Sequence, residues 1–192
     1  MIAGVILAGG LARRMGGGDK TLRPLGGQTV LARIVDRLGR QVEALALNAN
    51  GDRARFAAYG LPVLPDSVAD YPGPLAGVLA GMAWARELGA EWLVTAPGDA
   101  PFLPRDFVAR LIAGRGDAPY ACAASGGRTH PVAALWPVAA AARLAAALAA
   151  GQRKIDAFTG PGVAVIEWPV LPFDPFFNVN TPEDLAQAAT LL

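Results

Sequence analysis

Glycines and cations are concentrated in one stretch near the start of the sequence, LAGGLARRMGGGDK at residues 7–20. Gly9 and Gly10 let the backbone approach a ligand without a Cβ in the way, and the glycines at 16–18 let several amide groups converge on an anion. Arg14 and Lys20 add positive charge. The stretch therefore predicts a loop that binds phosphate, with an ordinary glycine-rich turn as the alternative.

Two familiar phosphate-binding patterns are excluded by the residues of this stretch. A Walker loop needs Gly directly before Lys-Thr, whereas Asp19 precedes Lys20 and Thr21 here. The dinucleotide-binding pattern G-x-G-x-x-G does not occur either. The sequence therefore predicts a third kind of phosphate loop.

Asp99 is the most suggestive acidic residue in the sequence. It lies in PGDAPFL, directly after the apolar run at residues 92–96, where Pro97 and Pro101 stiffen the loop and Gly98 permits a tight bend. Mg²⁺ takes one or two protein carboxylates and fills its other positions with water and phosphate oxygens. A single Asp beside a phosphate loop is therefore enough for a Mg²⁺ site.

Asparagines follow two other apolar runs. In LNAN, Asn48 and Asn50 lie on one side of an extended backbone, and a turn hydrogen bond or a polar ligand explains their amides equally well. In FFNVNTPEDL, Asn178 and Asn180 face one way while Val179 faces the core. For this second pair we favour contact with a cation or phosphate over a purely local role in the turn.

The remaining polar candidates are two aspartates and the residues around the single histidine. Asp66 and Asp70 precede a Pro-Gly-Pro turn, and for Asp66 taken alone a turn or cap role is the favoured interpretation. His130 follows Arg128 and Thr129; a structural histidine is the usual case, and a place at the rim of a second substrate is the alternative. We expect no Ser/His/Asp set around His130, and one His with one Cys does not make a zinc site.

The elements that must position these side chains alternate between β-type and helical patterns. Seven apolar runs predict strands, at residues 2–7, 44–48, 62–64, 92–96, 118–123, 131–136 and 163–166. Six segments have helical spacing, at 29–38, 52–59, 75–88, 104–113, 139–150 and 182–191. SGGRT at 125–129 predicts a turn that interrupts the parallel order. The expected fold class is α/β, a single three-layer α/β/α domain with a mainly parallel sheet and ligands at the carboxyl ends of its strands.

The composition limits the class of protein. A chain of 192 residues with 53% hydrophobic residues fits one domain with one substantial core. Lys and Arg number 17 and Asp and Glu 16, so the charge balance predicts no nucleic-acid or membrane partner. Cys122 predicts a buried small side chain, and the expected compartment is the cytoplasm. No signal peptide or membrane span is predicted, because glycine soon breaks the apolar start and Arg143 interrupts the Ala-rich stretch at 137–151.

Five motifs, in this order along the chain, resemble those of the molybdenum cofactor guanylyltransferases: LAGGLARRMGGGDK, NAN, DSVADYPGPLAG, PGDAPF and NVNTPEDL. That family is related to the nucleotide-sugar pyrophosphorylases, and the resemblance implies their Rossmann-like nucleotidyltransferase fold. It covers nearly the whole chain, and DYPGPLAG with NVNTPED are its most specific parts. It implies one domain over residues 1–192, whose N-terminal half binds GTP and whose C-terminal half binds a pterin.

The resemblance implies transfer of GMP from GTP to molybdenum-bound molybdopterin, with Mg²⁺ as the cofactor. The terminal phosphate of molybdopterin would attack the α-phosphorus of GTP, giving the guanine dinucleotide form of the cofactor and pyrophosphate. Such chemistry needs in-line positioning and charge neutralisation more than a protein nucleophile. Further partners implied by the resemblance are molybdenum-insertion proteins and acceptor molybdoenzymes.

The resemblance assigns roles position by position. The implied GTP-binding residues are Leu7, Ala8, Gly9, Gly10, Lys20, Asn48, Asp66 and Asp99. The implied catalytic residues are Asp99, Lys20 and Arg14, of which Asp99 is also the metal ligand. The expected residues of the pterin and metal side are Asn178, Asn180, His130 and Arg128. Arg153 and Lys154 in GQRKID either bind the acceptor phosphate or face water, and the second is favoured.

Three other interpretations stay open. A molybdopterin cytidylyltransferase is the nearest, but such enzymes tend to carry L-A-A-G where this chain has LAGG, so Gly9 favours guanine. A sugar-1-phosphate nucleotidyltransferase would share the loop and Asp99 but gives no reason for NVNTPED. A non-catalytic nucleotide-binding module would not need the complete set of loop, lysine and acid.

Overall fold

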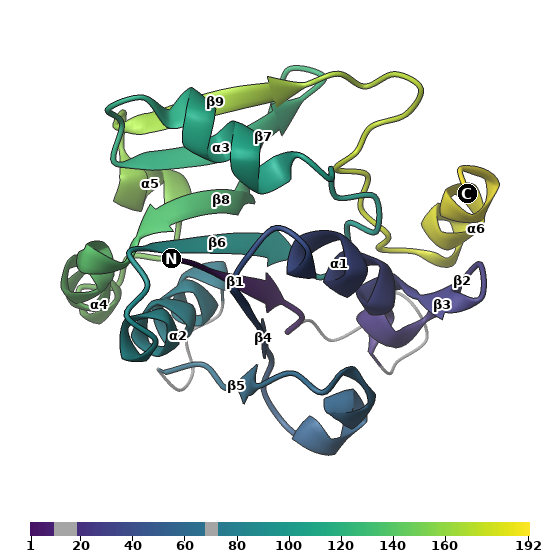
Figure 1. The fold of residues 1–192 in the computed structure, drawn as a ribbon, viewed down its shortest axis with the longest axis horizontal. Helices are drawn as coiled ribbons and strands as arrows, with labels where there is room; N and C mark the ends of the chain where they lie inside the picture. The colour runs from purple at the N-terminus through teal and green to yellow at the C-terminus, as the bar shows by residue number, and fades with distance from the viewer. Residues whose placement is uncertain (10–18, 68–72) are drawn as a thin grey trace.

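A computed structural model of the chain describes residues 1–9, 19–67 and 73–192. Its centre is a seven-stranded sheet with the order β5-β4-β1-β6-β8-β7-β9 (Figure 1). The strands are β1 (Ile2–Leu7), β4 (Ala44–Asn48), β5 (Val63–Leu64), β6 (Trp92–Pro97), β7 (Tyr120–Ser125), β8 (Arg128–Pro137) and β9 (Val163–Trp168). Within the described residues of this sheet, only β8 runs antiparallel to its neighbours.

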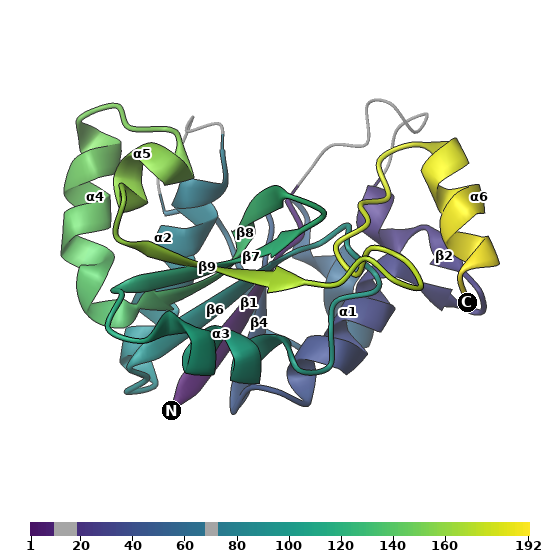
Figure 2. The ribbon, with the colours of Figure 1, turned by 90° about the horizontal axis from the view of Figure 1, so that it is seen from above.

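Helices cover both faces of the sheet, as Figure 2 shows. One face carries α2 (Pro74–Glu87), α4 (Ala141–Ala149) and α5 (Ile155–Thr159). The other face carries α1 (Val30–Gly39) and α3 (Phe107–Arg115), while α6 (Pro182–Thr190) lies beside the hairpin of β2 (Pro24–Leu25) and β3 (Gln28–Thr29). Short 3-10 helices are η2 (Lys20–Leu22), η3 (Arg53–Tyr59) and η4 (Val138–Ala140). The three-layer α/β/α fold with a mainly parallel sheet is confirmed.

All seven predicted strands are present, and the glycines of SGGRT form the predicted turn between β7 and β8 with positive φ at Gly126 and Gly127. The segment predicted to be helical at 52–59 forms a 3-10 helix, Arg53–Tyr59, rather than an α-helix. Asp52 caps this segment, and a left-handed Gly60 ends it, so the short stretch closes as the 3-10 helix η3. The hairpin of β2 and β3 was not predicted from the sequence, because its two-residue strands are too short to show a periodic pattern.

Two apolar layers hold the sheet between its helices. On one face of the sheet, Leu31 of α1 and Phe107 of α3 are buried. On the other face, Met82 of α2 and Leu144 of α4 are buried. The last helix is fixed at its start by a capping box, in which Thr181 and Asp184 each accept a hydrogen bond from the other's backbone amide. This cap determines where the chain enters α6 from the preceding residues 178–180, called the NVN segment below.

The carboxyl ends of four parallel strands meet in register at one edge of the sheet. Leu7 at the end of β1 pairs with Asn48 of β4 and with Pro97 of β6, and Asn48 pairs with Leu64 of β5. Because β8 runs antiparallel to β6, its first residues extend beyond the same edge. Loops from both halves of the chain are therefore brought to one place.

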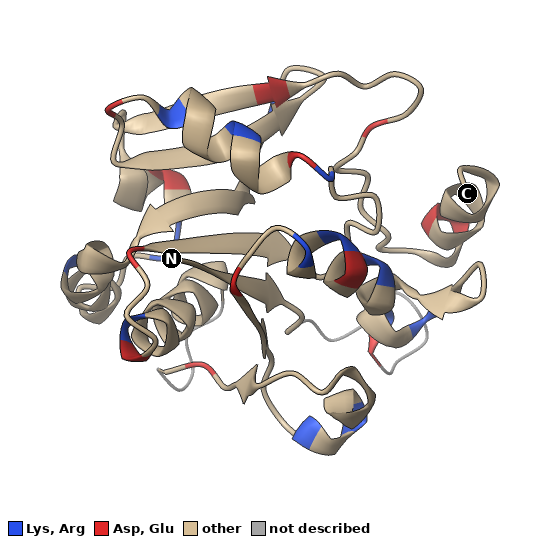
Figure 3. Ribbon diagram, viewed as in Figure 1, with Lys and Arg blue, Asp and Glu red and all other residues tan. Residues whose placement is uncertain are grey.

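Acidic and basic residues are interspersed over the described part of the chain (Figure 3). On the outer surface of α1, for example, Asp36 pairs with Arg40, with 2.8 Å between the carboxylate and guanidinium.

Among the described helices, none combines the length and the hydropathy needed to cross a bilayer.

Gly77 in α2 gives the Asn48 side chain its space. A Cβ at residue 77 would lie 2.2 Å from Asn48 Oδ1 and 2.8 Å from its Cγ. We expect Gly77→Ala to lower the free energy of unfolding by about 1–3 kcal/mol, as overpacking does, measured by urea unfolding. Gly39→Ala in α1 is the matched control, because its Cβ would meet one side-chain carbon at an ordinary 3.5 Å. An equal loss of stability in both variants would contradict this steric explanation.

Candidate active site

A cleft follows the edge where β5, β4, β1 and β6 end, and it continues over the start of β8. Its volume is about 1240 Å³, whereas pockets for one small ligand usually have about 300–1,000 Å³. Residues that line its first half include Leu7, Ala8, Gly9, Lys20, Asn48 and Asp66. Residues that line its second half include Arg128, His130, Phe176 and Asn178. The cleft therefore has room for two ligands.

The ammonium of Lys20 joins two distant segments at the floor of this cleft. Lys20 Nζ lies 2.5 Å from Asp99 Oδ2 and 2.8 Å from Asn180 Oδ1. The side chains of Lys20 and Asp99 are only 21% and 15% exposed, so this ion pair is largely shielded from water. A lysine ammonium has three N–H donors, and these two partners leave one for an oxygen of a ligand. The arrangement is suited to binding an anion next to a carboxylate.

The three partners are held by their local structure. Lys20 begins η2, which Asp19 caps by accepting hydrogen bonds from the amide and hydroxyl of Thr21 at 3.2 and 2.7 Å. Asp99 follows β6, and its carbonyl accepts a hydrogen bond of 2.8 Å from the amide of Val179, which is buried as predicted. This backbone contact brings the NVN segment against the exit of β6.

The oxygens around Lys20 match the ligands that a hard divalent cation prefers. Asp99 and Asn180 both direct an oxygen to the same positive charge. Within the described residues, no group of three or more His, Cys, Asp or Glu side chains could hold a metal. Asp99 and Asn180 would supply one carboxylate and one neutral oxygen, which suits Mg²⁺ because this cation also binds substrate phosphate and water.

Asp66 bridges two asparagines, Asn48 at the end of β4 and Asn50 just after it. Its carboxylate accepts hydrogen bonds from Asn48 Nδ2 at 3.0 Å and Asn50 Nδ2 at 2.7 Å, and its amide donates to Asn50 Oδ1 at 2.9 Å. Asn48 is 6% exposed and also donates to the Leu64 carbonyl. Both amides thus face one side, as predicted, and Asp66 is their partner. The side chains of Asn48, Asn50 and Asp66 form a hydrogen-bonded polar wall of the cleft, called the asparagine wall below.

Arg55 is a cleft residue that the sequence analysis missed. Its Nε donates to Asp19 Oδ2 at 2.9 Å, and its other nitrogens donate to the carbonyls of Asp52 and Asn50 at 2.7 and 2.8 Å. It thereby ties the asparagine wall to the turn that carries Lys20. No motif marked Arg55 in the sequence, because its partners come from separate loops.

The expectation that no Ser/His/Asp set surrounds His130 is wrong. Ser125 Oγ lies 2.7 Å from His130 Nε2 and donates to Asp174 Oδ1 at 2.7 Å. Asp174 follows Ser125 by 49 residues, so the contact depends on how the C-terminal loop packs. Burial lowers the pKa of His130 and Arg128 acts in the same direction, while the carboxylates of Asp174 and Glu167 oppose them.

Several predicted site residues cannot be placed or lie elsewhere. Gly10, Arg14, the glycines at 16–18 and Asp70 lie outside the described residues. Arg153 and Lys154 are exposed, and neither lines the cleft. The structure brings the other predicted residues to one edge of the sheet, and their individual roles stay predictions.

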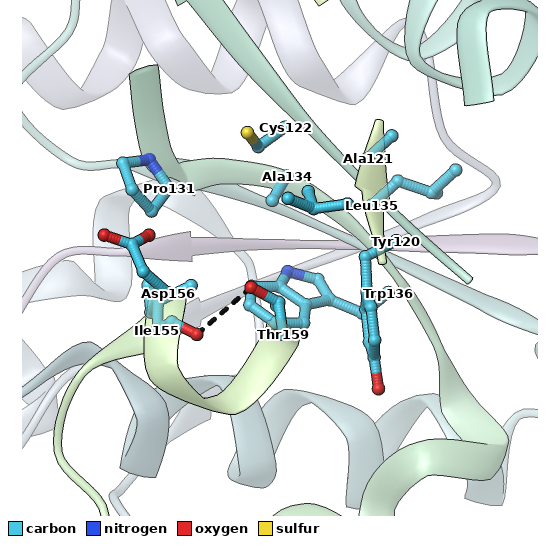
Figure 4. Close-up of a pocket in the computed structure, with 11 residues that line it drawn as sticks. Tyr120, Ala121, Cys122, Pro131, Ala134, Leu135, Trp136, Ile155, Asp156 and Thr159 are labelled. Atoms are coloured by element: carbon cyan, nitrogen blue, oxygen red, sulfur yellow. Dashed lines mark hydrogen bonds between the residues drawn. The ribbon is translucent and has the colours of Figure 1, made fainter. Parts of the chain in front are cut away.

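A second, smaller cavity lies between β7, β8 and α5 (Figure 4). Its lining includes Cys122, Asp156 and Thr159. Burial, with a contribution from the charge of Asp156, raises the pKa of the Cys122 thiol to about 11. The thiol is therefore protonated at neutral pH and unreactive, which agrees with the prediction of a buried small side chain.

Sequence relatives of this chain include molybdenum cofactor guanylyltransferases. Residues 4–163 match the family described as MobA-like NTP transferase domain. A molybdenum cofactor guanylyltransferase of Rhodopseudomonas palustris (strain BisB5) is 59% identical over 96% of this chain and 90% of its own length. A protein of the same name from Bradyrhizobium sp. (strain ORS 278) is 54% identical over 99% of this chain and 92% of its own length.

Solved structures share the fold at low identity. Molybdopterin-guanine dinucleotide biosynthesis protein A from Archaeoglobus fulgidus has a TM-score of 0.74 at 24% identity, covering 100% of this chain and 98% of its own. The 4-diphosphocytidyl-2C-methyl-D-erythritolsynthase from Anaerococcus prevotii has a TM-score of 0.76 at 15% identity, covering 100% and 95%. The predicted nucleotidyltransferase fold is therefore confirmed.

Replacing Arg55 tests whether it ties the walls of the cleft together. We expect Arg55→Ala to lower the free energy of unfolding by about 1–2 kcal/mol, because charge-assisted hydrogen bonds are lost at a partly exposed site. Urea unfolding measures this. Arg53→Ala on the exposed side of η3 is the control and should change stability by less than about 0.5 kcal/mol. If the two variants unfold alike, Arg55 does not have this structural role.

Proposed function

Because this chain belongs to the MobA-like NTP transferases and, among them, to the molybdenum cofactor guanylyltransferases, we propose that its cleft is where GMP passes from GTP to molybdenum-bound molybdopterin. An oxygen of the terminal phosphate of molybdopterin attacks the α-phosphorus of GTP, and the bond to the bridging oxygen of the pyrophosphate breaks. The products are the guanine dinucleotide cofactor and pyrophosphate. The observation that carries the proposal is the Lys20–Asp99–Asn180 junction in a cleft large enough for two substrates.

The half of the cleft formed by β1, β4 and β5 is proposed to bind GTP. Leu7, Ala8 and Gly9 line this half at the end of β1. The Leu7 carbonyl accepts from the Gly98 amide and the Ala8 amide donates to the Asn48 carbonyl, so Gly9 is the residue whose backbone is proposed to meet the nucleotide. The polar wall of Asn48 and Asp66 lies beside them. Preorganised polar groups of this kind can orient a base and its sugar without rearrangement. In this proposal the N-terminal half of the domain binds GTP, and Gly10 of the adjoining loop stays a predicted contact.

Lys20 is proposed to bind the phosphates. Its remaining N–H donor can bind a phosphate oxygen while Asp99 and Asn180 fix its position. A positioned cation stabilises the negative charge that develops when the bond to pyrophosphate breaks. Asp99 and Asn180 would hold Mg²⁺, which when bound supplies further positive charge to the phosphates. Arg14 stays a predicted additional cation of the same loop.

The acceptor is proposed to occupy the half of the cleft over β8, within the C-terminal part of the domain. Arg128, His130 and Asn178 line this half, and the NVN segment joins it to Lys20 through Asn180. The phosphate of the pterin would then approach the α-phosphorus from the side opposite the leaving pyrophosphate. Soluble molybdenum-insertion proteins and acceptor molybdoenzymes in the cytoplasm are the proposed neighbours in the cell, with no role for nucleic acid or membrane.

The proposal is tested by pyrophosphate release. We expect the purified protein to release pyrophosphate from GTP with molybdenum-bound molybdopterin and Mg²⁺, and none from GTP alone. Asp99→Ala and Lys20→Ala should each lower the rate by about 10²–10³, as the loss of a preorganised charge contact does. Asp117→Ala and Lys154→Ala, at exposed positions outside the cleft, are the matched controls. Near-normal turnover in Asp99→Ala would refute the proposed site, and turnover only with sugar phosphates would refute the proposed substrate.

Gly9 provides a test of nucleotide choice, since a cytidylyltransferase is the nearest alternative. A Cβ at Gly9 would come no closer than 3.9 Å to any described protein atom. In this proposal the added methyl group meets the nucleotide, and it makes no close contact with the described residues. We expect Gly9→Ala to lower kcat/KM for GTP by about 10-fold or more relative to CTP, with an unchanged melting temperature. An unchanged ratio of GTP to CTP would exclude Gly9 as a determinant of guanine specificity.

A further inference from the structure

The contacts of His130 form a defined hydrogen-bonded chain at the acceptor half of the cleft. Ser125, at the end of β7, is 1% exposed and lies between His130 and Asp174. Asp174 is held in turn by the amide of Phe176, which donates to Oδ1 at 2.9 Å. The imidazole stacks on the Phe176 ring with a centroid distance of 4.8 Å and an interplanar angle of 25°. Both the position and the plane of the imidazole are thus fixed.

The donors and acceptors of this chain determine where the imidazole carries its hydrogen. An ionised carboxylate can only accept hydrogen bonds, so the single hydroxyl hydrogen of Ser125 goes to Asp174. The Ser125 oxygen is then the acceptor for His130, and Nε2 must be the donor. A neutral imidazole with hydrogen on Nε2 has an unprotonated Nδ1. The lowered pKa of His130 favours this neutral form at neutral pH.

Nδ1 is then the nitrogen that remains for a ligand. His130 lines the cleft, and its hydrogen bond to the described residues is made through Nε2. A lone pair at Nδ1 repels the oxygens of an ionised phosphate and attracts an N–H group. The ligand group that fits is therefore an N–H donor on a heterocycle, and not a phosphate.

The strand order indicates which heterocycle this is. Asn48 ends β4, and three strand-to-strand steps through β1 and β6 separate β4 from β8, which carries His130. With strands about 4.8 Å apart, this corresponds to about 14 Å. One planar base cannot contact the asparagine wall and His130 together. If the nucleotide base lies at the wall, the heterocycle at His130 belongs to the acceptor.

We propose that Ser125 and Asp174 are positioning residues, which hold His130 with hydrogen on Nε2 so that Nδ1 accepts a hydrogen bond from a ring N–H of the pterin. This inference rests on the proposed function, since it requires the pterin to be the second substrate. In this proposal His130 selects the ring system of the acceptor, whereas other groups bind the acceptor's phosphate.

The hydrogen position can be measured directly, because His130 is the single histidine of the chain. In protein labelled with ¹⁵N-histidine, NMR at pH 7.5 should show a protonated Nε2 and an unprotonated Nδ1. Ser125→Ala should shift the signals toward a mixture of tautomers. Adding molybdopterin should shift the Nδ1 resonance, and adding GTP alone should leave it unchanged. Hydrogen on Nδ1 in the unliganded wild-type protein would overturn the inference.

Two substitutions of His130 separate its two nitrogens in kinetic assays. In His130→Gln the longer amide can still donate to Ser125, but no acceptor remains near the Nδ1 position. In His130→Asn the shorter side chain keeps an acceptor there. We expect His130→Gln to raise the KM for molybdopterin about tenfold with the KM for GTP unchanged, and His130→Asn to raise it less.

These outcomes distinguish failure of the inference from failure of the proposed function. If the wild-type protein releases pyrophosphate normally and His130→Gln has the same KM for molybdopterin, only the inference fails. If the wild-type protein forms no product from GTP and molybdopterin, the proposed function fails, while the NMR signals still report whether Ser125 fixes the tautomer. Melting temperatures of all variants show whether a change in KM comes from loss of the fold.

Discussion

The ammonium of Lys20 lies between the carboxylate of Asp99 and the amide oxygen of Asn180, and the cleft depends on this contact. It connects η2 with Asp99 at the exit of β6, 79 residues away in sequence, and with Asn180 before α6, 160 residues away. A partly buried carboxylate without a cation would be costly, so Lys20 stabilises Asp99 as well as providing a donor for phosphate. Structural and proposed chemical roles therefore coincide at one side chain.

A second constraint is the direction of the strands. The parallel strands β5, β4, β1 and β6 all end at the same edge, where the asparagine wall, the Lys20 junction and Gly9 meet. The antiparallel β8 starts at that edge, and it brings His130 and Arg128 from a different part of the chain. The one reversed strand thus adds a second half to a cleft that parallel strands alone would leave as a site for one ligand.

Hydrophobic runs and the positions where strands end were sufficient to predict the seven strands of the central sheet, the layers and the meeting of Lys20, Asp99 and the NVN segment, whereas the short strands β2 and β3 were not predicted. They failed where a contact joins two loops that carry no periodic pattern. Arg55 and Asp19 are 36 residues apart, and Ser125 and Asp174 are 49 apart. The need for glycine at residue 77 was also not predicted. Only the packed position of the Asn48 side chain shows that a Cβ at residue 77 has no space. Side-chain partners between loops depend on tertiary packing, which local sequence does not encode.

The most direct measurement is a crystal structure with Mg²⁺ and a GTP analogue whose α–β bridge cannot be cleaved. We expect the base to lie beside Gly9 and the asparagine wall, with Lys20 donating to a phosphate oxygen next to Asp99. A nucleotide bound over His130 and Arg128, or with its phosphates away from Lys20, would contradict this expectation.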